Sequence, residues 1–186
     1  MKHGTVAFQG SPGAYSHEAC VRLAPHETPK GFDTVPDAIA AVKRGECACA
    51  LVPIEVRPAK PMADNLALVE EAGLHVTADT WMTVRHHLLG APGASLTDIK
   101  EVRSHPVALA QCAATLNRLK LQAVEAVDTA GAARDLAKTR DRTVAVIASR
   151  TAAELYELEI LRDSLEDQPG NAIRFALVGP EPRQAE

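Results

Sequence analysis

Short apolar runs alternate with amphipathic stretches along the whole of this 186-residue sequence. The apolar runs have the length of strands, whereas the amphipathic stretches repeat their apolar residues at helical spacing. Gly, Pro, Ser or Asp stands at most of the junctions, as turns and helix caps require. This alternation predicts an α/β fold, built either as one domain or as two small lobes.

The junctions indicate where each element lies. We expect strands at residues 5–9, 49–54, 74–78, 82–89, 101–104, 122–127, 143–148, 160–161 and 175–178. We expect helices at residues 15–23, 33–44, 65–71, 128–137 and 149–155. Two more helices are predicted from their first residues: a short one after Ser95, with Asp98 in place of the usual Glu of a capping box, and one that runs from His105-Pro106 past Leu116.

Composition excludes several classes of partner. The net charge is -4 and aromatic residues make up 3% of the chain, which leaves no basic surface or stacking platform for nucleic acid. No apolar run approaches the length of a membrane span or of a signal sequence, so we expect a cytoplasmic protein with no membrane partner. The cysteines lack metal-finger spacing, and we expect free, mostly buried thiols at Cys20, Cys47, Cys49 and Cys112.

Six short motifs follow one another along the chain. They are Gly10-x-x-Gly13-x-Tyr15-Ser16, Val52-Pro53-Ile54-Glu55, Ser104-His105-Pro106-x-Ala108-Leu109-x-Gln111-Cys112, Asp128-Thr129-Ala130-Gly131-Ala132-Ala133, Ala148-Ser149-x-x-Ala152-Ala153-Glu154-Leu155-Tyr156 and Asn171-x-x-Arg174-Phe175. In order and spacing they resemble the prephenate dehydratase domain over nearly the whole chain. Each motif alone is weak, but six in register are hard to obtain by chance.

The resemblance implies a two-lobed α/β fold similar to type 2 periplasmic binding proteins, each lobe a small sheet flanked by helices. The first lobe is expected to hold residues 1–78 and 172–186, the second residues 79–171, and a small carboxylic acid is expected to bind in the cleft between them. The family's usual reaction converts prephenate to phenylpyruvate with loss of carbon dioxide and the ring hydroxyl. It implies no cofactor and no metal. We also expect a homodimer, and no ACT domain for feedback by phenylalanine.

Two helix N-termini are candidates for holding the carboxylates of such a substrate. One is Ser104-His105-Pro106; the other is Thr129 with the small residues Ala130 and Gly131. Ser104, Gln111 and Thr129 match positions that line the family's site. Ser104 and Thr129 could instead only cap their helices, Gln111 could point to solvent, and His105 could be either a proton donor or a structural hydrogen-bonding group.

The sequence departs from the family in two places. After Glu55, a carboxylate whose burial requires a partner or a functional position, the family continues with Asn-Ser, whereas this chain has Val56 and Arg57. In the last motif the family has Thr-Arg-Phe, and its threonine is the leading candidate to protonate the departing hydroxyl. Here Ile173 precedes Arg174.

Isoleucine cannot donate a proton, and loss of a positioned acid typically lowers a rate by about 10²- to 10⁴-fold. Three hypotheses follow. The chain is a dehydratase-like carbon–oxygen lyase with altered substrate or mechanism, for example in specialised biosynthesis such as that of tropone-type antibiotics. Alternatively, it is an ordinary prephenate dehydratase in which another group, such as His105 or Thr129, supplies the proton. The third hypothesis is a non-catalytic protein that binds a small acid, with Arg57 and Arg174 as anion contacts.

Overall fold

A computed structural model describes residues 4–57 and 60–181, and these divide into two compact units. The first unit holds residues 4–11, 15–57, 60–84 and 170–181; the second holds residues 12–14 and 85–169. In each unit a small sheet is flanked by helices, which confirms the predicted α/β class. Residues 1–3, 58–59 and 182–186 of the predicted first lobe lie outside the described residues.

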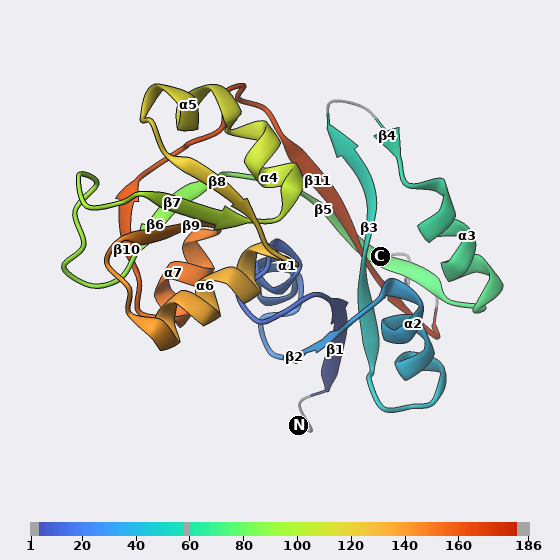
Figure 1. The fold of residues 1–186 in the computed structure, drawn as a ribbon. Helices are drawn as coiled ribbons and strands as arrows, with labels where there is room; N and C mark the ends of the chain where they lie inside the picture. Colours follow the sequence, from blue (N-terminus) through green and yellow to red (C-terminus); the bar gives the residue numbers. More distant parts are fainter. Residues whose placement is uncertain (1–3, 58–59, 182–186) are drawn as a thin grey trace. The chain divides into compact units, whose positions relative to one another are not determined.

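The first unit is built on the strand order β2-β1-β3-β11-β5. Its strands are β1 (Thr5–Gln9), β2 (Thr28–Phe32), β3 (Cys49–Arg57), the short β4 (Lys60–Pro61) beside β3, β5 (His75–Thr83) and β11 (Ala172–Gly179). β1 pairs in parallel with β2 and β3, whereas β11 lies antiparallel between β3 and β5 (Figure 1). The last strand of the chain is therefore a central strand of the first unit.

Three helices cover the two faces of this sheet: α1 (Tyr15–Leu23), α2 (Val35–Lys43) and α3 (Ala63–Glu71). α2 begins as the sequence predicts, because the Thr34 side chain accepts a hydrogen bond from the Asp37 N–H and Pro36 occupies the first turn. The apolar sides of α2 and α3 pack on one face of the sheet, and α1 packs on the other face with Ala19 and Cys20. Each face thus has its own core.

The second unit is built on the strand order β10-β6-β9-β7-β8. Its strands are β6 (His87–Gly90), β7 (Glu101–Ser104), β8 (Gln122–Glu125), β9 (Val144–Ala148) and β10 (Glu159–Arg162). The apolar run of β9 is buried along its full length, as a central strand requires. α4 (Pro106–Gln111) and α5 (Ala113–Arg118) cover one face, and α6 (Thr129–Thr139) and α7 (Arg150–Leu155) the other.

Several elements differ from those expected. The strand predicted at residues 82–89 is divided between the end of β5 and the start of β6. The helix predicted after Ser95 is only a turn: Ser95 N–H and Oγ both donate to Asp98 Oδ2, so the capping contacts form but no helix follows. The helix predicted from His105 past Leu116 is interrupted at Cys112, which separates α4 from α5. The crossing predicted at residue 79 falls inside β5, because this strand stays paired with β11 up to Thr83.

The Gly10–Gly13 turn was expected to lie wholly in the first lobe. In the structure, residues 12–14 belong to the second unit. The Tyr156 hydroxyl donates to the Pro12 carbonyl at 2.7 Å, and the Ser149 hydroxyl donates to the Gly13 carbonyl at 2.6 Å. Gly13 has φ +91°, and an added Cβ would meet the α7 backbone at Ala152 at 3.1 Å. The positive φ and this close approach both require a glycine at position 13.

The start of α5 is fixed by a residue far along the chain. Asp167 Oδ2 and Oδ1 accept the Ala114 and Thr115 N–H groups, both at 2.8 Å. Burial raises the pKa of the Asp167 carboxyl, but the hydrogen bonds from these two residues outweigh it and lower that pKa below its usual range. Asp167 therefore stabilises the helix most at pH values where it is ionised.

Replacing Asp167 with alanine is expected to lower the free energy of unfolding by about 1–2 kcal/mol, because two helix N–H groups lose their acceptor. Urea denaturation at neutral pH measures this change. Asp33→Ala, which removes an exposed loop carboxylate, is the matched control. Equal stabilities of the two variants would show that the Asp167 cap contributes nothing.

Candidate active site

The candidate residues of the first unit lie where β3 ends and β11 begins. Across the sheet, Glu55, Arg174 and Trp81 form one row of neighbours, and Val56, Ile173 and Met82 form the next. Adjacent rows point to opposite faces of a sheet, so the charged row and the apolar row lie on different sides. The structure brings Glu55, Val56, Ile173 and Arg174 together but divides their side chains between two faces.

Arg174 is held by two carboxylates on the charged face. Its Nε lies 2.9 Å from Asp79 Oδ1 and its Nη1 lies 3.7 Å from Glu55 Oε2. The hydrogen bond and charge of Asp79, and then the charge of Glu55, raise the pKa of Arg174. Arg174 thereby supplies the partner that a half-buried Glu55 requires, and its own charge is already balanced within the unit.

Arg57 is the more accessible cation of this group. Its guanidinium carbon lies 3.9 Å from the centre of the Trp81 ring, a cation–π contact, and its side chain is exposed. Stacking on an aromatic face leaves the guanidinium N–H groups free to donate in the ring plane. Arg57 is thus better placed than Arg174 to contact an added anion.

Ile173 belongs to an apolar cluster on the opposite face. It packs, half-buried, against buried residues of the sheet and of α1: Val6, Phe8, Ala19, Cys20, Leu51, Met82 and Phe175. Its neighbour across the sheet, Val56, is also half-buried. Neither side chain carries a group that can give or take a proton, so this row supplies apolar surface only.

In the second unit, Ser104 and His105 join β7 to α4. Ser104 is fully buried, and its hydroxyl donates to the Ile147 carbonyl of β9 at 2.7 Å. His105 is the cap of α4: its Nδ1 accepts the Val107 N–H at 3.2 Å. The neutral ring therefore carries its proton on Nε2. With Pro106 lacking an N–H and Val107 already paired, this N-terminus has fewer free donors than the sequence suggested.

The first turn of α6 holds Thr129, Ala130 and Gly131. Its cap is Asp128, whose Oδ1 accepts the Gly131 N–H at 2.6 Å, so the idea that Thr129 caps the helix is wrong. A Cβ at Gly131 would come within 2.7 Å of Asp128 Oδ2, which explains the glycine. The N–H groups of Thr129 and Ala130 precede the first intrahelical bond, and within residues 4–57 and 60–181 the Thr129 hydroxyl has no hydrogen-bond partner.

Gln111, the last residue of α4, does not simply point to solvent. Its Oε1 lies 2.6 Å from Nε2 of His86, a residue that is 2% exposed. Burial lowers the pKa of His86, although the hydrogen bond from Gln111 and the charge of Glu166 act in the opposite direction. No sequence motif singles out His86, because its partner Gln111 is 25 residues away.

The histidines near the start of β6 make the second unit sensitive to acid. Burial also lowers the pKa of His87; Arg150 lowers it further, and Asp163 and Glu166 oppose this. A folded-state pKa below the ordinary value of 6.5 means that stability is fully present above pH 6.5. It is lost as the pH falls below that value, because the unfolded chain takes up these protons first.

Thermal denaturation between about pH 8 and pH 5 is expected to show this loss. A His86→Leu variant, which cannot titrate there, should show a shallower decline of Tm below pH 6.5 than the unaltered protein. His75→Leu, at an exposed position of β5, should keep the full decline. Parallel curves for the His86 variant and the unaltered protein would exclude His86 as a source of the acid sensitivity.

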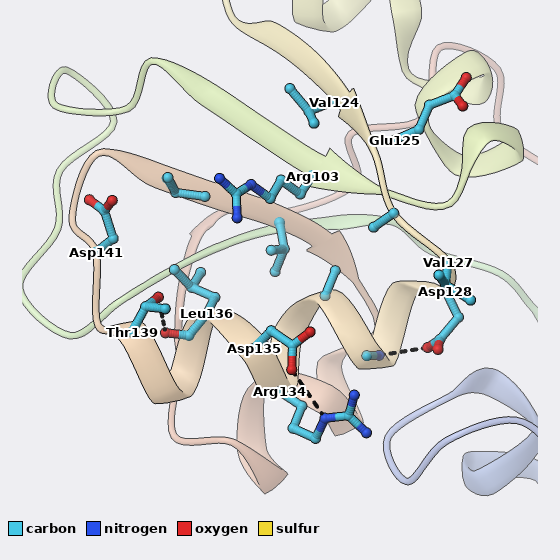
Figure 2. Close-up of a pocket in the computed structure, with 15 residues that line it drawn as sticks. Arg103, Val124, Glu125, Val127, Asp128, Arg134, Asp135, Leu136, Thr139 and Asp141 are labelled. Atoms are coloured by element: carbon cyan, nitrogen blue, oxygen red, sulfur yellow. Dashed lines mark hydrogen bonds and ion pairs between the residues drawn. The ribbon is translucent and has the colours of Figure 1, made fainter.

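A groove of about 660 Å³ lies beside α6 (Figure 2). Val124, Leu136, Val144 and Val146 form its apolar part, and Arg103 stands above it on β7. Figure 2 shows Asp128 at the start of α6 and an Arg134–Asp135 contact on its outer side, at 3.3 Å. Of the six motifs, only the one at residues 128–133 contributes to this groove, through Asp128, Gly131 and Ala132, and of these only Gly131 was predicted to bind substrate.

In the described part of the chain no group of three or more His, Cys, Asp or Glu is arranged to hold a metal ion. All four cysteines are free; Cys20, Cys47 and Cys112 are buried and Cys49 is half-buried. Burial raises the pKa of Cys20 and of Cys112 to about 12, so these thiols stay protonated. Every described helix falls short of the length and apolarity of a membrane span.

The chain is similar to known proteins along most of its length. The family model described as prephenate dehydratase matches residues 6–183. A bifunctional N-acyl-homoserine lactone acylase/prephenate dehydratase of Komagataeibacter europaeus is 40% identical over 95% of the chain and 63% of its own length. Arogenate dehydratase/prephenate dehydratase 1 of Arabidopsis thaliana is 37% identical over 95% of the chain and 45% of its own length.

Among solved structures, that of GqqA, described as a novel type of quorum quenching acylase, superimposes with a TM-score of 0.88. It is 38% identical and the match covers 98% of the chain and 66% of GqqA. The chain therefore spans between about half and two thirds of the length of these three proteins. The residues matched by the prephenate dehydratase family model include all six motifs described above.

Proposed function

Because the chain belongs to the prephenate dehydratase family, we propose that it is a dehydratase-type lyase for a small cyclic carboxylic acid, with prephenate a poor substrate. The observation that carries this proposal is the place of Ile173 in an apolar cluster. In the family's motif a threonine stands at this position. Here the side chain is packed among Met82 and Phe175 and has no proton to give.

The chemistry explains why that position matters. When prephenate loses its ring carboxylate, the electron pair of the broken carbon–carbon bond enters the ring and expels the hydroxyl from the opposite carbon. One proton must reach this hydroxyl so that it departs as water, and the products are phenylpyruvate, carbon dioxide and water. Because aromatisation supplies the driving force, the protein chiefly has to hold the carboxylates and deliver that proton.

Groups suited to these tasks are present in the second unit. The Thr129 hydroxyl is unpaired among the described residues, and it stands beside two free N–H groups at a helix N-terminus, where a carboxylate is favoured. His105 holds its ring proton on Nε2, since Nδ1 accepts the Val107 N–H. We therefore propose Thr129 as the proton donor that remains, with His105 as the second candidate. Glu55 keeps a structural role beside Arg174.

Ile173 and Val56 favour a substrate whose part nearest to this row is less polar than the corresponding part of prephenate. They replace the family's small polar groups by apolar ones, and an unpartnered hydroxyl of the substrate would be costly against them. Arg57 adds an exposed cation on the other face. A smaller ring acid, which keeps one hydroxyl as the group that leaves as water, suits this apolar row. A role in specialised metabolism, including tropone-type antibiotics, a cytoplasmic location and a homodimer remain predictions.

A panel of acids tests the proposal. Prephenate, arogenate, a cyclohexadiene carboxylate without the ring hydroxyl, and an N-acyl-homoserine lactone would be incubated with the protein, while calorimetry follows binding and absorbance follows ring aromatisation. We expect saturable binding of the ring carboxylates and slow conversion of prephenate. Binding without conversion of any member would favour a non-catalytic acid-binding protein. Release of a free fatty acid from the lactone alone would favour an acylase and contradict the proposal.

A further inference from the structure

A buried histidine outside the six motifs contacts one of the candidate substrate-binding residues. His86 is 2% exposed, and its Nε2 lies 2.6 Å from Oε1 of Gln111. The main chain of His86 is fixed as well: its N–H donates to Glu166 Oε2 at 3.0 Å and its carbonyl accepts the Leu165 N–H at 2.7 Å. The imidazole is therefore held in one place before any ligand arrives.

The main chain of Gln111 is fixed in a similar way. Its carbonyl accepts the Asp167 N–H at 2.8 Å, and the Asp167 carboxylate in turn holds the Ala114 and Thr115 N–H groups. Gln111 thus ends α4 against a segment that also starts α5. The main chain of Gln111 is thus fixed, and the contact with His86 restricts the rotation of its side chain.

The position of the ring proton on His86 determines which group of the Gln111 amide remains available to a ligand, the N–H groups or the oxygen. An imidazole with its proton on Nε2 donates to Oε1, which leaves the two N–H groups of the amide free. In the described part of the chain these N–H groups have no partner. If Nε2 were the acceptor instead, the amide would turn over and present its carbonyl oxygen, which repels a carboxylate.

We propose that His86 is a positioning residue that donates from Nε2 to Gln111 and so makes the amide present its N–H groups to a substrate carboxylate. The inference rests on the proposed function, because it takes Gln111 as a contact of the substrate. Burial of the imidazole supports it, because water cannot compete for Oε1 and the neutral ring has a single proton, which lies on Nε2 when Oε1 is its acceptor.

A double-mutant cycle separates positioning from mere packing. Prephenate affinity would be measured by calorimetry for His86→Leu, Gln111→Met and the pair. Each single change is expected to weaken binding by about ten- to a hundredfold, the effect of one hydrogen bond to a charged group. The double variant should bind no more weakly than Gln111→Met alone, because His86 acts only through Gln111. His86→Gln, which keeps a donor near the position of Nε2, should restore affinity to within about threefold.

Two results overturn the proposal: unchanged affinity in His86→Leu, or losses that multiply in the double variant, as expected of two independent contacts. The side-chain amide of Gln111 gives a readout that needs no ligand. Its two N–H resonances, assigned by their absence in Gln111→Met, should move in His86→Leu towards those of the exposed Gln122. If they do not move, the orientation is not set by His86, whatever the affinity. If the unaltered protein binds no ring carboxylate while the resonances do move, the proposed function fails and the orientation by His86 stands.

Discussion

Replacing Ile173 with threonine and Val56 with asparagine is expected to raise phenylpyruvate formation from prephenate by about 10²- to 10⁴-fold, the usual contribution of a positioned acid. The two residues are direct neighbours across β11 and β3, so the pair restores polar groups in one row of the sheet. Initial rates, followed by the absorbance of phenylpyruvate, measure the gain. The substitution also removes apolar contacts from the cluster around Phe175, and some loss of Tm is expected.

Leu177→Thr is the matched control for this experiment. Leu177 lies on the same strand, four residues from Ile173, and packs against the same apolar cluster. Its replacement should cost comparable stability without any gain in rate. If the double variant is folded and shows no gain over the unaltered protein, the missing threonine and asparagine are not what limits prephenate turnover.

Replacing Thr129 with valine is expected to lower the residual conversion of prephenate by about 10²- to 10⁴-fold, because it removes the proposed proton donor. Valine keeps the shape of threonine and leaves the Asp128 cap in place, so α6 should remain intact. The loss should appear mainly in kcat rather than in KM. Initial rates over a range of prephenate concentrations separate the two.

Three further variants are needed to interpret the result for Thr129→Val. Thr129→Ser keeps a hydroxyl and should retain most of the rate. Thr139→Val, at the other end of the same helix, removes a hydroxyl that donates to the Leu136 carbonyl and should leave the rate unchanged. His105→Asn keeps a side chain that can cap α4 and should cost less than about tenfold. A larger loss from the His105 variant than from Thr129→Val would assign the proton to His105.

The central strands could be predicted because their apolar runs are continuous. β1 and β9 lie within one residue of the expected bounds, since each is buried on both faces by neighbouring strands and helices. β2 was not predicted. Its sequence, Thr28-Pro29-Lys30-Gly31-Phe32, has no strand pattern, and it is a strand only because its backbone pairs with β1 at the edge of the sheet.

The sequence could indicate candidate site residues, but not the contacts that they make. The sequence pointed to Arg174, but its partner Asp79 lies 95 residues away, and their contact depends on the register between β11 and β5. The same is true of Asp167, whose carboxylate separates α5 from α4 across more than 50 residues. Motifs indicate which residues matter, whereas the pairing that fixes their charge and orientation is set by tertiary contacts.

The chain has the fold of its family, and we propose that it keeps the anion-binding groups but lacks the usual proton donor. The most direct test is the rate of phenylpyruvate formation from prephenate, measured beside a family member that carries Thr-Arg-Phe in its last motif. We expect saturable binding and a kcat about 10²- to 10⁴-fold below that of the threonine-bearing enzyme. An equal kcat would contradict the account, because Ile173 would then stand where no proton donor is needed.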